Sequence, residues 1–302
     1  MSGFSSSEFL DFSYSSTNDI LHKGIFTTSN GEDFPYFIVE KNGRNFFVTP
    51  ICLSGPSVFD EEKDFALLQD KLKDYNLSGG FIQTRQSIEE TEELGETASA
   101  NFFKDYRTNF RLHFGDDNFV LDNMHKSAKR YSKKILAEQE KYTLKLIDSQ
   151  DLKSIELFAN MYSNTAERLE FSDSYKFNLD LWIQLLSSKK SKLYLLYYED
   201  QLISGTVVNP VPLGYDYTFV THDTSFKNSG RANAIFLLKH LYSIDPSGFL
   251  DLGGGVTEGD SLSRFKKEMG CSSQLFKRLR FIFPDQYKET QDYNCLKGYW
   301  PQ

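Results

Sequence analysis

The sequence is poor in the residues that build disulfide frameworks and metal sites. Its 302 residues include only three cysteines, which are odd in number and far apart. That spacing fits neither a disulfide framework nor a zinc site. The five histidines show no metal-ligand spacing either. We therefore expect no bound metal.

Long apolar runs and an excess of positive charge are also missing. No run approaches the roughly 18 apolar residues that a membrane-spanning helix needs. The first residues, Met1–Ser7, lack the charged and apolar regions of a secretory signal. We therefore expect a cytoplasmic protein without a transmembrane segment. The formal net charge of −8 argues against nucleic acid as the main partner.

Several common catalytic motifs are absent. The chain has no Walker A loop, no Gly-x-Ser-x-Gly elbow and no His-Glu-x-x-His helix. What it does have is 39% hydrophobic and 15% aromatic residues, which is the composition of a globular protein. A chain of 302 residues can hold one large domain or two of ordinary size. The sequence does not indicate an oligomeric state.

A short apolar run followed by a glycine turn is the feature around which we organise the chain. Residues 249–252 predict the end of a buried strand. The next three residues are Gly253, Gly254 and Gly255. Glycines can take a positive φ and let a ligand approach the backbone closely. The turn is therefore a candidate substrate-binding segment, although a tight turn without a ligand has the same composition.

A short helix is expected after this turn, over residues 261–269. Asp260 is a suitable N-cap and Gly270 a suitable C′ residue. At about 100° per residue the apolar residues share one face; they are Leu262, Phe265 and Met269. Lys266 falls only about 40° from Leu262 and should be half-buried. It is either a snorkelling side chain whose ammonium reaches water, or a catalytic cation.

The segment from Gly253 to Gly270 resembles the closing motif of the FemAB-like transferases. The resemblance lies in the glycines, a short spacer, Leu262 and Phe265-Lys266-x-x-Met269-Gly270. These proteins are acyl- and aminoacyltransferases with GNAT-type folds, related to the enzymes that build peptidoglycan bridges. Their motif usually ends Phe-Lys-x-x-Phe-Gly, so Met269 departs from it. The resemblance implies that Lys266 is catalytic.

The N-terminal half predicts one α/β unit. Residues 1–33 are polar and should be a loosely structured lead-in with one short helix. Two β-rich runs at 36–40 and 45–49 flank an Asn-Gly pair and predict a hairpin. A helix within 60–75 and a strand at 79–84 should follow and pack on the same sheet.

The most basic segment of the chain, residues 122–145, begins with a predicted helix. Four cations gather on one side of it by i, i+3 and i+4 spacing: Lys126, Lys129, Arg130 and Lys133. They form either an exposed charged face or an anion site for a phosphate-bearing donor or acceptor. FemAB-like proteins have a similar basic helix between their halves, so the resemblance also makes this segment a domain boundary.

From residue 142 onward the expected order of elements is that of a GNAT domain. A strand, two helices, three β-rich runs, a helix and a final strand follow one another. Within the first helix, Phe158-x-x-x-Tyr162-x-x-Thr165-x-x-Arg168 resembles the paired-helix signature of the FemAB-like group. The resemblance implies substrate-binding roles for Tyr162 and Arg168.

The segment after the third β-rich run resembles the pyrophosphate-binding segment of GNAT enzymes. It contains Lys227, Gly230, Arg231, Ala232 and Asn233 at the start of a predicted helix. Small residues let a phosphate approach the exposed N–H groups of a helix N-terminus, and the cations add charge-assisted hydrogen bonds. A helix start without a ligand remains the alternative.

His222 and Asp223 end the third β-rich run, beside the place where GNAT enzymes bind the acyl group. His222 could act as a general base because its ordinary pKa is near neutral. A polar residue at a strand end without a catalytic role has the same appearance.

Taken together, the sequence predicts an α/β protein of two GNAT-like units, each with a mixed, mainly antiparallel sheet flanked by helices. The units should span residues 1–118 and 142–302, with a linking helix at 119–141. The resemblance implies transfer of an acyl group from acyl-CoA, with acetyl-CoA the favoured donor. The acceptor would be an amine or hydroxyl on a cell-envelope or polysaccharide precursor, such as a small molecule or a lipid- or nucleotide-linked sugar.

Two other functions stay open from the sequence. An aminoacyl-tRNA-dependent transferase would use the basic segment on RNA, although the acidic net charge disfavours it. A binding module for sugar-phosphates or glycans would use the same sites without catalysis.

Overall fold

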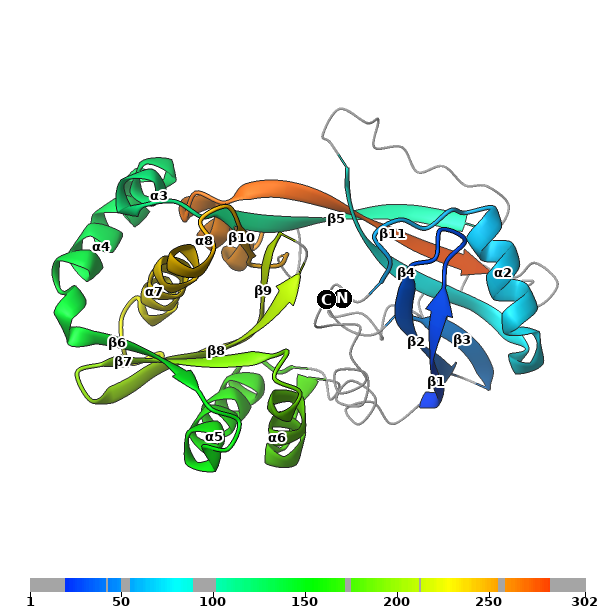
Figure 1. Cartoon of the computed structure of the whole chain (residues 1–302), viewed down its shortest axis with the longest axis horizontal. Helices are drawn as coiled ribbons and strands as arrows, with labels where there is room; N and C mark the ends of the chain where they lie inside the picture. The colour runs from blue at the N-terminus through cyan, green and yellow to red at the C-terminus, as the bar shows by residue number, and fades with distance from the viewer. Residues whose placement is uncertain are drawn as a thin grey trace. The chain divides into compact units, whose positions relative to one another are not determined.

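Strands and helices alternate along the chain as an α/β protein requires (Figure 1). The computed structural model describes residues 20–41, 43–49, 55–88, 102–171, 175–211, 213–254 and 259–282. By contacts, these residues divide into two units. One unit is residues 109–273, and the other combines the described residues before 109 with those after 273. The expected division into 1–118, 119–141 and 142–302 has other bounds and stays a prediction.

The unit formed by the earlier residues has a small sheet. β1 (Ile20–Thr27), β2 (Asp33–Lys41) and β3 (Arg44–Val48) pair antiparallel in turn. β3 then pairs in parallel with β4 (Leu77–Ile88), which pairs antiparallel with β11 (Ser272–Ile282).

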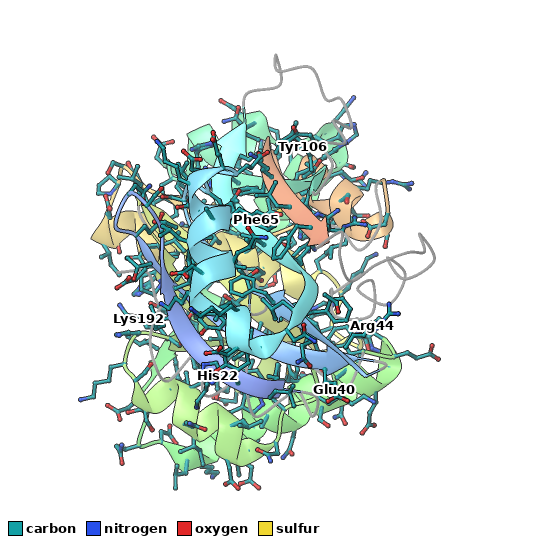
Figure 2. The ribbon with its side chains drawn as sticks, turned by 90° about the vertical axis from the view of Figure 1, so that its right-hand side faces the viewer. His22, Glu40, Arg44, Phe65, Tyr106 and Lys192 are labelled. Atoms are coloured by element: carbon teal, nitrogen blue, oxygen red, sulfur yellow. The ribbon has the colours of Figure 1, made fainter. Side chains whose placement is uncertain are left out.

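The predicted hairpin is confirmed. Lys41 pairs with Arg44 at the end of the two strands, and Figure 2 labels Glu40 and Arg44 there. The lead-in prediction is wrong for β1, since residues 20–27 form a strand. Its residues alternate between half-buried and exposed over most of their length. The apolar residues do not follow this alternation, since Leu21 and Ile25 are exposed while Phe26 is buried, and pairing with β2 stabilises the strand.

The expected helix of this unit is α2 (Lys63–Lys71), followed by a 3-10 turn over Lys73–Tyr75. Its buried residues Phe65 and Leu68 pack into an aromatic core with Phe26, Phe34 and Phe281. Phe65 is labelled on the helix in Figure 2. Full burial of each such side chain contributes on the order of 1.5–3 kcal/mol, which explains why an otherwise polar helix docks here.

The larger unit begins with residues 109–113 of β5 (Phe102–His113), continues with helices and then builds a mostly antiparallel sheet. α3 (Asp117–Asn123) precedes the basic helix α4 (Lys126–Ala137), and a 3-10 turn over Gln139–Lys141 leads into β6 (Tyr142–Ile147). β7 (Lys192–Tyr198), β8 (Gln201–Val211) and β9 (Gly214–His222) follow as successive antiparallel neighbours. β10 (Phe249–Asp251) pairs in parallel with β9 and antiparallel with β5. The predicted α/β fold with a mixed, mainly antiparallel sheet is confirmed.

Helices cover both faces of this sheet (Figure 1). α5 (Leu152–Arg168) and α6 (Leu179–Ser187) lie on one face, and α7 (Ser229–Ile244) lies on the other. α7 connects β9 to its parallel neighbour β10, as a parallel pair requires. Asp151 caps the start of α5 by accepting the Ser154 N–H at 3.1 Å. Among the described residues, no helix is both long and apolar enough to cross a membrane.

Candidate functional site

The helix expected after the glycine turn is α8 (Ser261–Glu268), and its ends are fixed as predicted. The Asp260 carboxylate accepts the Ser263 N–H at 2.6 Å. Gly270 follows the helix with a φ of +83°, and a β-carbon there would lie 2.6 Å from the Asn123 carbonyl oxygen. Both the backbone angle and the close approach therefore require glycine at this position.

The buried face of α8 is centred on Lys266. Ser263 and Lys266 are 5% exposed and Met269 is fully buried, whereas Leu262 is 42% exposed. The expectation that Leu262 belongs to the buried stripe is therefore wrong. Residues 263, 266 and 269 follow one another at i+3 spacing, and it is this row that faces the protein interior.

The amine of Lys266 also lies inside the protein. Its Nζ donates a hydrogen bond to the Gly254 carbonyl oxygen at 2.6 Å. Gly253 has a φ of +68°, and a β-carbon there would lie 3.9 Å from Nζ. The snorkelling interpretation is wrong in this structure, since the ammonium binds the glycine turn. Gly255 lies outside the described residues.

The glycine turn follows the point where two parallel strands stop pairing. β10 pairs with β9 over only three residues, and the register ends at Asp251 and Asp216. β9 continues to His222, where it still pairs with β8. Six further residues at about 3.3 Å each carry β9 roughly 20 Å past the last pair with β10. The Lys266 amine thus binds the turn that follows β10, next to the point where β9 and β10 stop pairing.

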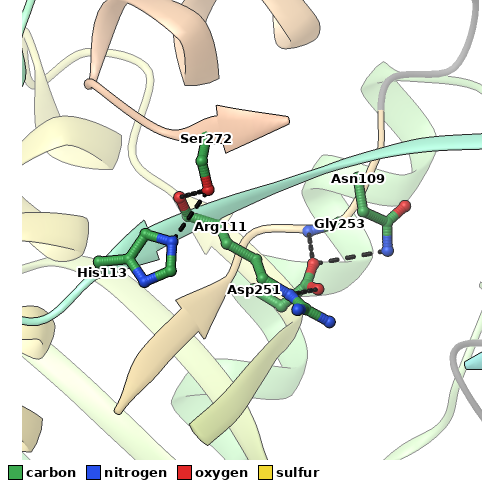
Figure 3. Close-up of polar contacts among 6 residues, drawn as sticks. All are labelled: Asn109, Arg111, His113, Asp251, Gly253 and Ser272. Carbon is green, nitrogen blue, oxygen red and sulfur yellow. Dashed lines mark hydrogen bonds and ion pairs between the residues drawn. The ribbon is translucent and has the colours of Figure 1, made fainter. Parts of the chain in front are cut away.

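A buried carboxylate stands directly before the turn (Figure 3). Asp251 is fully buried, and its Oδ1 accepts hydrogen bonds from the Gly253 N–H at 2.8 Å and from Asn109 Nδ2 at 3.5 Å. Its Oδ2 accepts a hydrogen bond from Arg111 Nε at 3.2 Å. Burial raises the pKa of Asp251, while the Gly253 N–H, Arg111 and Lys266 favour the charged form.

Sequence reasoning missed Asp251 and its partners. A signal was present, because a charged residue inside a short apolar strand requires a partner. The partners Asn109 and Arg111 lie on β5, more than a hundred residues away, and no local pattern links them to β10.

Two neighbouring groups are poor nucleophiles or bases. Burial raises the pKa of the Cys271 thiol to about 12, so this thiol stays protonated near neutral pH. His113 Nε2 lies 3.0 Å from Ser272 Oγ (Figure 3). Burial, assisted by Arg111, lowers the pKa of His113.

His222 lies at a second place, against the start of α7. A β-carbon on Gly230 would lie 3.7 Å from His222 Nδ1. This nitrogen is buried, and it has no hydrogen-bond partner among the residues that the structure describes. Burial lowers the pKa of His222, and the nearby Arg168 adds to the effect while Asp223 opposes it. The imidazole is therefore neutral near pH 7.

Asp223 holds the turn between β9 and α7. Its carboxylate accepts hydrogen bonds from the Ser225 N–H at 2.8 Å and the Ser225 hydroxyl at 2.6 Å. The Gln201 amide donates a third at 3.1 Å. These hydrogen bonds, led by those from Ser225, lower the pKa of Asp223. The contacts suit a structural role, and a catalytic role for Asp223 stays a prediction.

The start of α7 has the features of an anion site. Asn228 precedes the helix with a φ of +65° and makes no side-chain cap. The first N–H groups of a helix have no acceptor within it. The Ser229 N–H donates instead to the Phe226 carbonyl at 3.3 Å, and the next two N–H groups belong to Gly230 and Arg231. Lys227 is exposed beside them.

The next two residues of α7 face the interior. Ala232 is 1% exposed and Asn233 is fully buried. The side-chain oxygen Oδ1 of Asn233 accepts hydrogen bonds from the Thr206 hydroxyl at 2.8 Å and the Tyr217 hydroxyl at 2.7 Å. The side chain of Asn233 therefore anchors α7 to the sheet.

The basic helix and the start of α7 meet at Tyr131. The Arg231 guanidinium lies 5.6 Å from the centre of this ring, and Lys227 Nζ lies 5.7 Å from it. The neighbouring Arg130 is 5.1 Å from the same ring. Arg231 is 8% exposed and approaches Glu268 of α8 at 3.8 Å. Two segments that looked separate in the sequence thus share one cationic cluster.

The basic face of α4 is not uniform. Lys129 binds Asp122 through an ion pair of 2.6 Å on its exposed side. Arg130, one residue further along the helix, instead contacts Tyr131, the same side chain that Lys227 approaches. Only part of the predicted basic face is therefore directed toward α7.

The two residues of the paired-helix signature differ in their surroundings. Tyr162 is 2% exposed and packs against Phe158, Trp182 and Phe219. It holds α5 on the sheet, so its contact with a substrate stays a prediction. Arg168 is exposed at the end of α5 and close enough to His222 to influence its pKa.

The contacts therefore bring the predicted residues together in two groups. Lys266 lies with Gly253 and Gly254 at the end of β10, and His222 lies with Gly230 near the start of α7. Arg231 of α7 contacts the rings of Tyr131 on α4 and Phe265 on α8.

Comparisons with solved structures define the class of this fold. The chain aligns with FemX at a TM-score of 0.63 and 12% identity, over 92% of each chain. These values confirm the FemAB-like, GNAT-type fold that the sequence predicts; at such low identity they concern the fold.

Two further structures agree. A conserved protein of unknown function from Bacteroides thetaiotaomicron aligns at a TM-score of 0.61 and 11% identity, over 91% of this chain and 90% of that one. L-PGS from Bacillus licheniformis aligns at 0.56 and 12% identity, over 97% and 96%. No family model and no curated protein matches the sequence.

Proposed function

We propose that this protein is a GNAT-type acyltransferase that moves an acyl group from acyl-CoA to an amine or hydroxyl. The observation that carries the proposal is the buried Lys266 amine on the glycine turn, where β9 and β10 stop pairing. A cation in a site of low water content stabilises negative charge far better than one in solvent. A shared fold alone would not support this activity.

The donor would lie along β9. The α7 N-terminus, with Lys227, Gly230 and Arg231, would bind the diphosphate through N–H groups and charge. Ala232 provides a small residue and Asn233 keeps the helix in place. The roughly 20 Å of β9 beyond its last pair with β10 suit the long arm of CoA, with acetyl-CoA as the favoured donor.

At the other end, Lys266 would stabilise the oxyanion that forms when the acceptor attacks the thioester carbonyl. The acceptor forms its new bond to the acyl carbon, and the carbon–sulfur bond breaks. The thiolate leaves and takes up the proton that the acceptor loses. Gly253 and Gly254 would let the acyl group approach the backbone.

His222 stays a candidate general base only for an acceptor that reaches the start of α7, because it lies there with Gly230, at the opposite end of β9 from the Lys266 amine. Its neutral imidazole can accept a proton, and Arg168 nearby could bind an anionic acceptor. The acceptor would be a cell-envelope or polysaccharide precursor, such as a lipid- or nucleotide-linked sugar, in the cytoplasm.

The cationic cluster at Tyr131 favours a second candidate, an aminoacyl-tRNA donor. Arg130, Lys227 and Arg231 could contact an RNA backbone that continues from the same α7 site. A binding module without catalysis would use the same cluster for a sugar-phosphate.

Isothermal titration with CoA, acetyl-CoA and a tRNA mixture tests these alternatives. We expect CoA and acetyl-CoA to bind with similar affinity, since both carry the diphosphate, and tRNA to bind more weakly. Binding of tRNA alone would replace the donor in our proposal, and binding of none of the three would reject an enzyme of this type.

A further inference from the structure

We propose that Asp251 is a positioning residue, which holds the glycine turn and, through it, the amine of Lys266. The functional consequence rests on the proposed role of Lys266. The placement of the Lys266 amine by Asp251 is independent of that role, and it can be measured without knowing the donor.

The first step is the burial of Asp251. A fully buried carboxylate is costly unless hydrogen bonds and a cation compensate it. Here Asn109 and Arg111 reach it from β5, and Arg111 also lies 4.3 Å over the Phe249 ring. Because Asn109 and Arg111 belong to β5 and not to the glycine turn, they hold the Asp251 carboxylate in place independently of the turn.

The second step leads from Asp251 to Lys266. Asp251 accepts the Gly253 N–H two residues later, which is the hydrogen bond of an Asx turn. That hydrogen bond stabilises the positive φ of Gly253 and sets the direction of the next carbonyl. The carbonyl of Gly254 then accepts the hydrogen bond from Lys266 Nζ. The backbone of Phe110 on β5 holds the same turn, because its carbonyl accepts the Leu252 N–H at 2.8 Å and its N–H donates to the Gly253 carbonyl at 3.1 Å. The side chain of Asp251 adds to these backbone contacts the hydrogen bond that lies nearest to Gly254.

The third step is electrostatic. Lys266 favours the charged form of Asp251, so the carboxylate attracts the ammonium in return. The carboxylate does not suit the role of general base itself. It is fully buried, and both oxygens already accept hydrogen bonds.

Lysine acylation measured by mass spectrometry tests the placement. N-hydroxysuccinimidyl acetate labels exposed amines, so in the parent protein Lys266 should react at least tenfold more slowly than the exposed Lys267 beside it. Asp251→Ala removes both the acceptor and the charge and should raise the rate at Lys266 at least tenfold. Asp251→Asn keeps an acceptor for the Gly253 N–H and should give an intermediate rate.

Asp245→Asn is the matched control. Asp245 forms the same kind of turn, accepting the Ser247 N–H at 3.1 Å, but lies after α7 and outside the site. It should leave labelling of Lys266 unchanged. Lys192 and Lys239 are half-buried lysines on β7 and α7, so they report general loosening of the fold. If they gain reactivity as much as Lys266 does, Asp251 only stabilises the fold and the proposal is wrong. Unchanged labelling of Lys266 in a folded Asp251 variant also overturns it.

The two proposals can fail separately. If the titration finds no donor while labelling of Lys266 responds to Asp251, the acyltransferase proposal fails and the positioning role stands. If a donor is found, both Asp251 variants should lower kcat more than they change KM, because they displace Lys266 rather than the donor site.

Discussion

At the scale of single residues, Lys266 shows how one side chain can be assigned from its surroundings. A lysine beside an apolar stripe usually reaches water with its ammonium. Here the side chain lies on the buried row of α8, and its amine finds an acceptor in the Gly254 carbonyl. A group placed this way keeps its direction during a reaction, which is what electrostatic stabilisation of a transition state requires.

Lys266→Met should lower kcat by a factor on the order of 10² to 10³, with donor binding largely intact. Methionine keeps most of the stem's packing and removes the charge. It also leaves the Gly254 carbonyl without the amine, which should cost about 1–3 kcal/mol in the free energy of unfolding. Steady-state kinetics, well below the melting temperature of the variant, separate the two effects.

Lys267→Met is the control for this substitution. Lys267 is exposed, and its neighbour carries the buried amine. The control should change kcat by less than twofold and stability hardly at all. Small and equal effects of the two substitutions on kcat would show that Lys266 has no catalytic role and that the glycine turn is purely structural.

At the scale of elements, the start of α7 is the part of the fold most suited to an anion. Its first N–H groups point away from the helix body, and the helix dipole adds positive potential there. Asn228 provides no side-chain cap, whereas Asp151, Asn178 and Asp260 cap α5, α6 and α8. Among the described helices, α2 and α4 also begin without a side-chain cap, so the assignment of the α7 start to the donor rests on the motif and on its cations Lys227 and Arg231.

Gly230→Asp should weaken donor binding at least tenfold, because a carboxylate would compete with a phosphate for the same N–H groups. The fold should tolerate the change. A β-carbon at this position makes only ordinary contact with His222, at 3.7 Å. Titration of CoA into both proteins gives the comparison.

Gly230→Ala separates charge from bulk in this test. It adds the same β-carbon without a carboxylate and should reduce affinity by less than threefold. Equal affinities of the Ala and Asp variants, or an affinity of the Asp variant equal to that of the parent, would exclude this helix start as the phosphate site.

At the scale of the whole molecule, the sequence predicted local elements better than long-range contacts. The hairpin around Asn-Gly and the caps of α8 depend on residues within a few positions of one another, and both were found. β1 was missed because its apolar residues do not all lie on its buried side: Leu21 and Ile25 are exposed, so the strand shows no clear alternation and depends on pairing with β2.

In the candidate site, too, the local contacts could be predicted from the sequence and the long-range contacts could not. The glycine turn and Lys266 lie within one short segment, so their association could be predicted. Arg111, which binds Asp251 from 140 positions away, could not. The meeting of Arg130 with Arg231 at Tyr131 likewise follows from the packing of α4 on α7, which no periodicity in either helix reveals.

The last prediction concerns stability against pH. Burial lowers the pKa of three histidines, His113, His222 and His240, from the ordinary value of 6.5. Below about pH 6.5 the unfolded chain therefore binds more protons than the folded one, and the stability from these neutral side chains is lost as the pH falls. Asp251, whose pKa is raised by burial, acts in the opposite sense.

We expect the melting temperature of the parent to fall between pH 7 and pH 5. The fall should be smaller in the triple variant His113→Gln, His222→Gln and His240→Gln, which cannot take up these protons. Differential scanning calorimetry at matched ionic strength measures both slopes. Parallel slopes would show that the three imidazoles titrate alike in the folded and unfolded chain, and that the neutral state inferred for His222 is wrong.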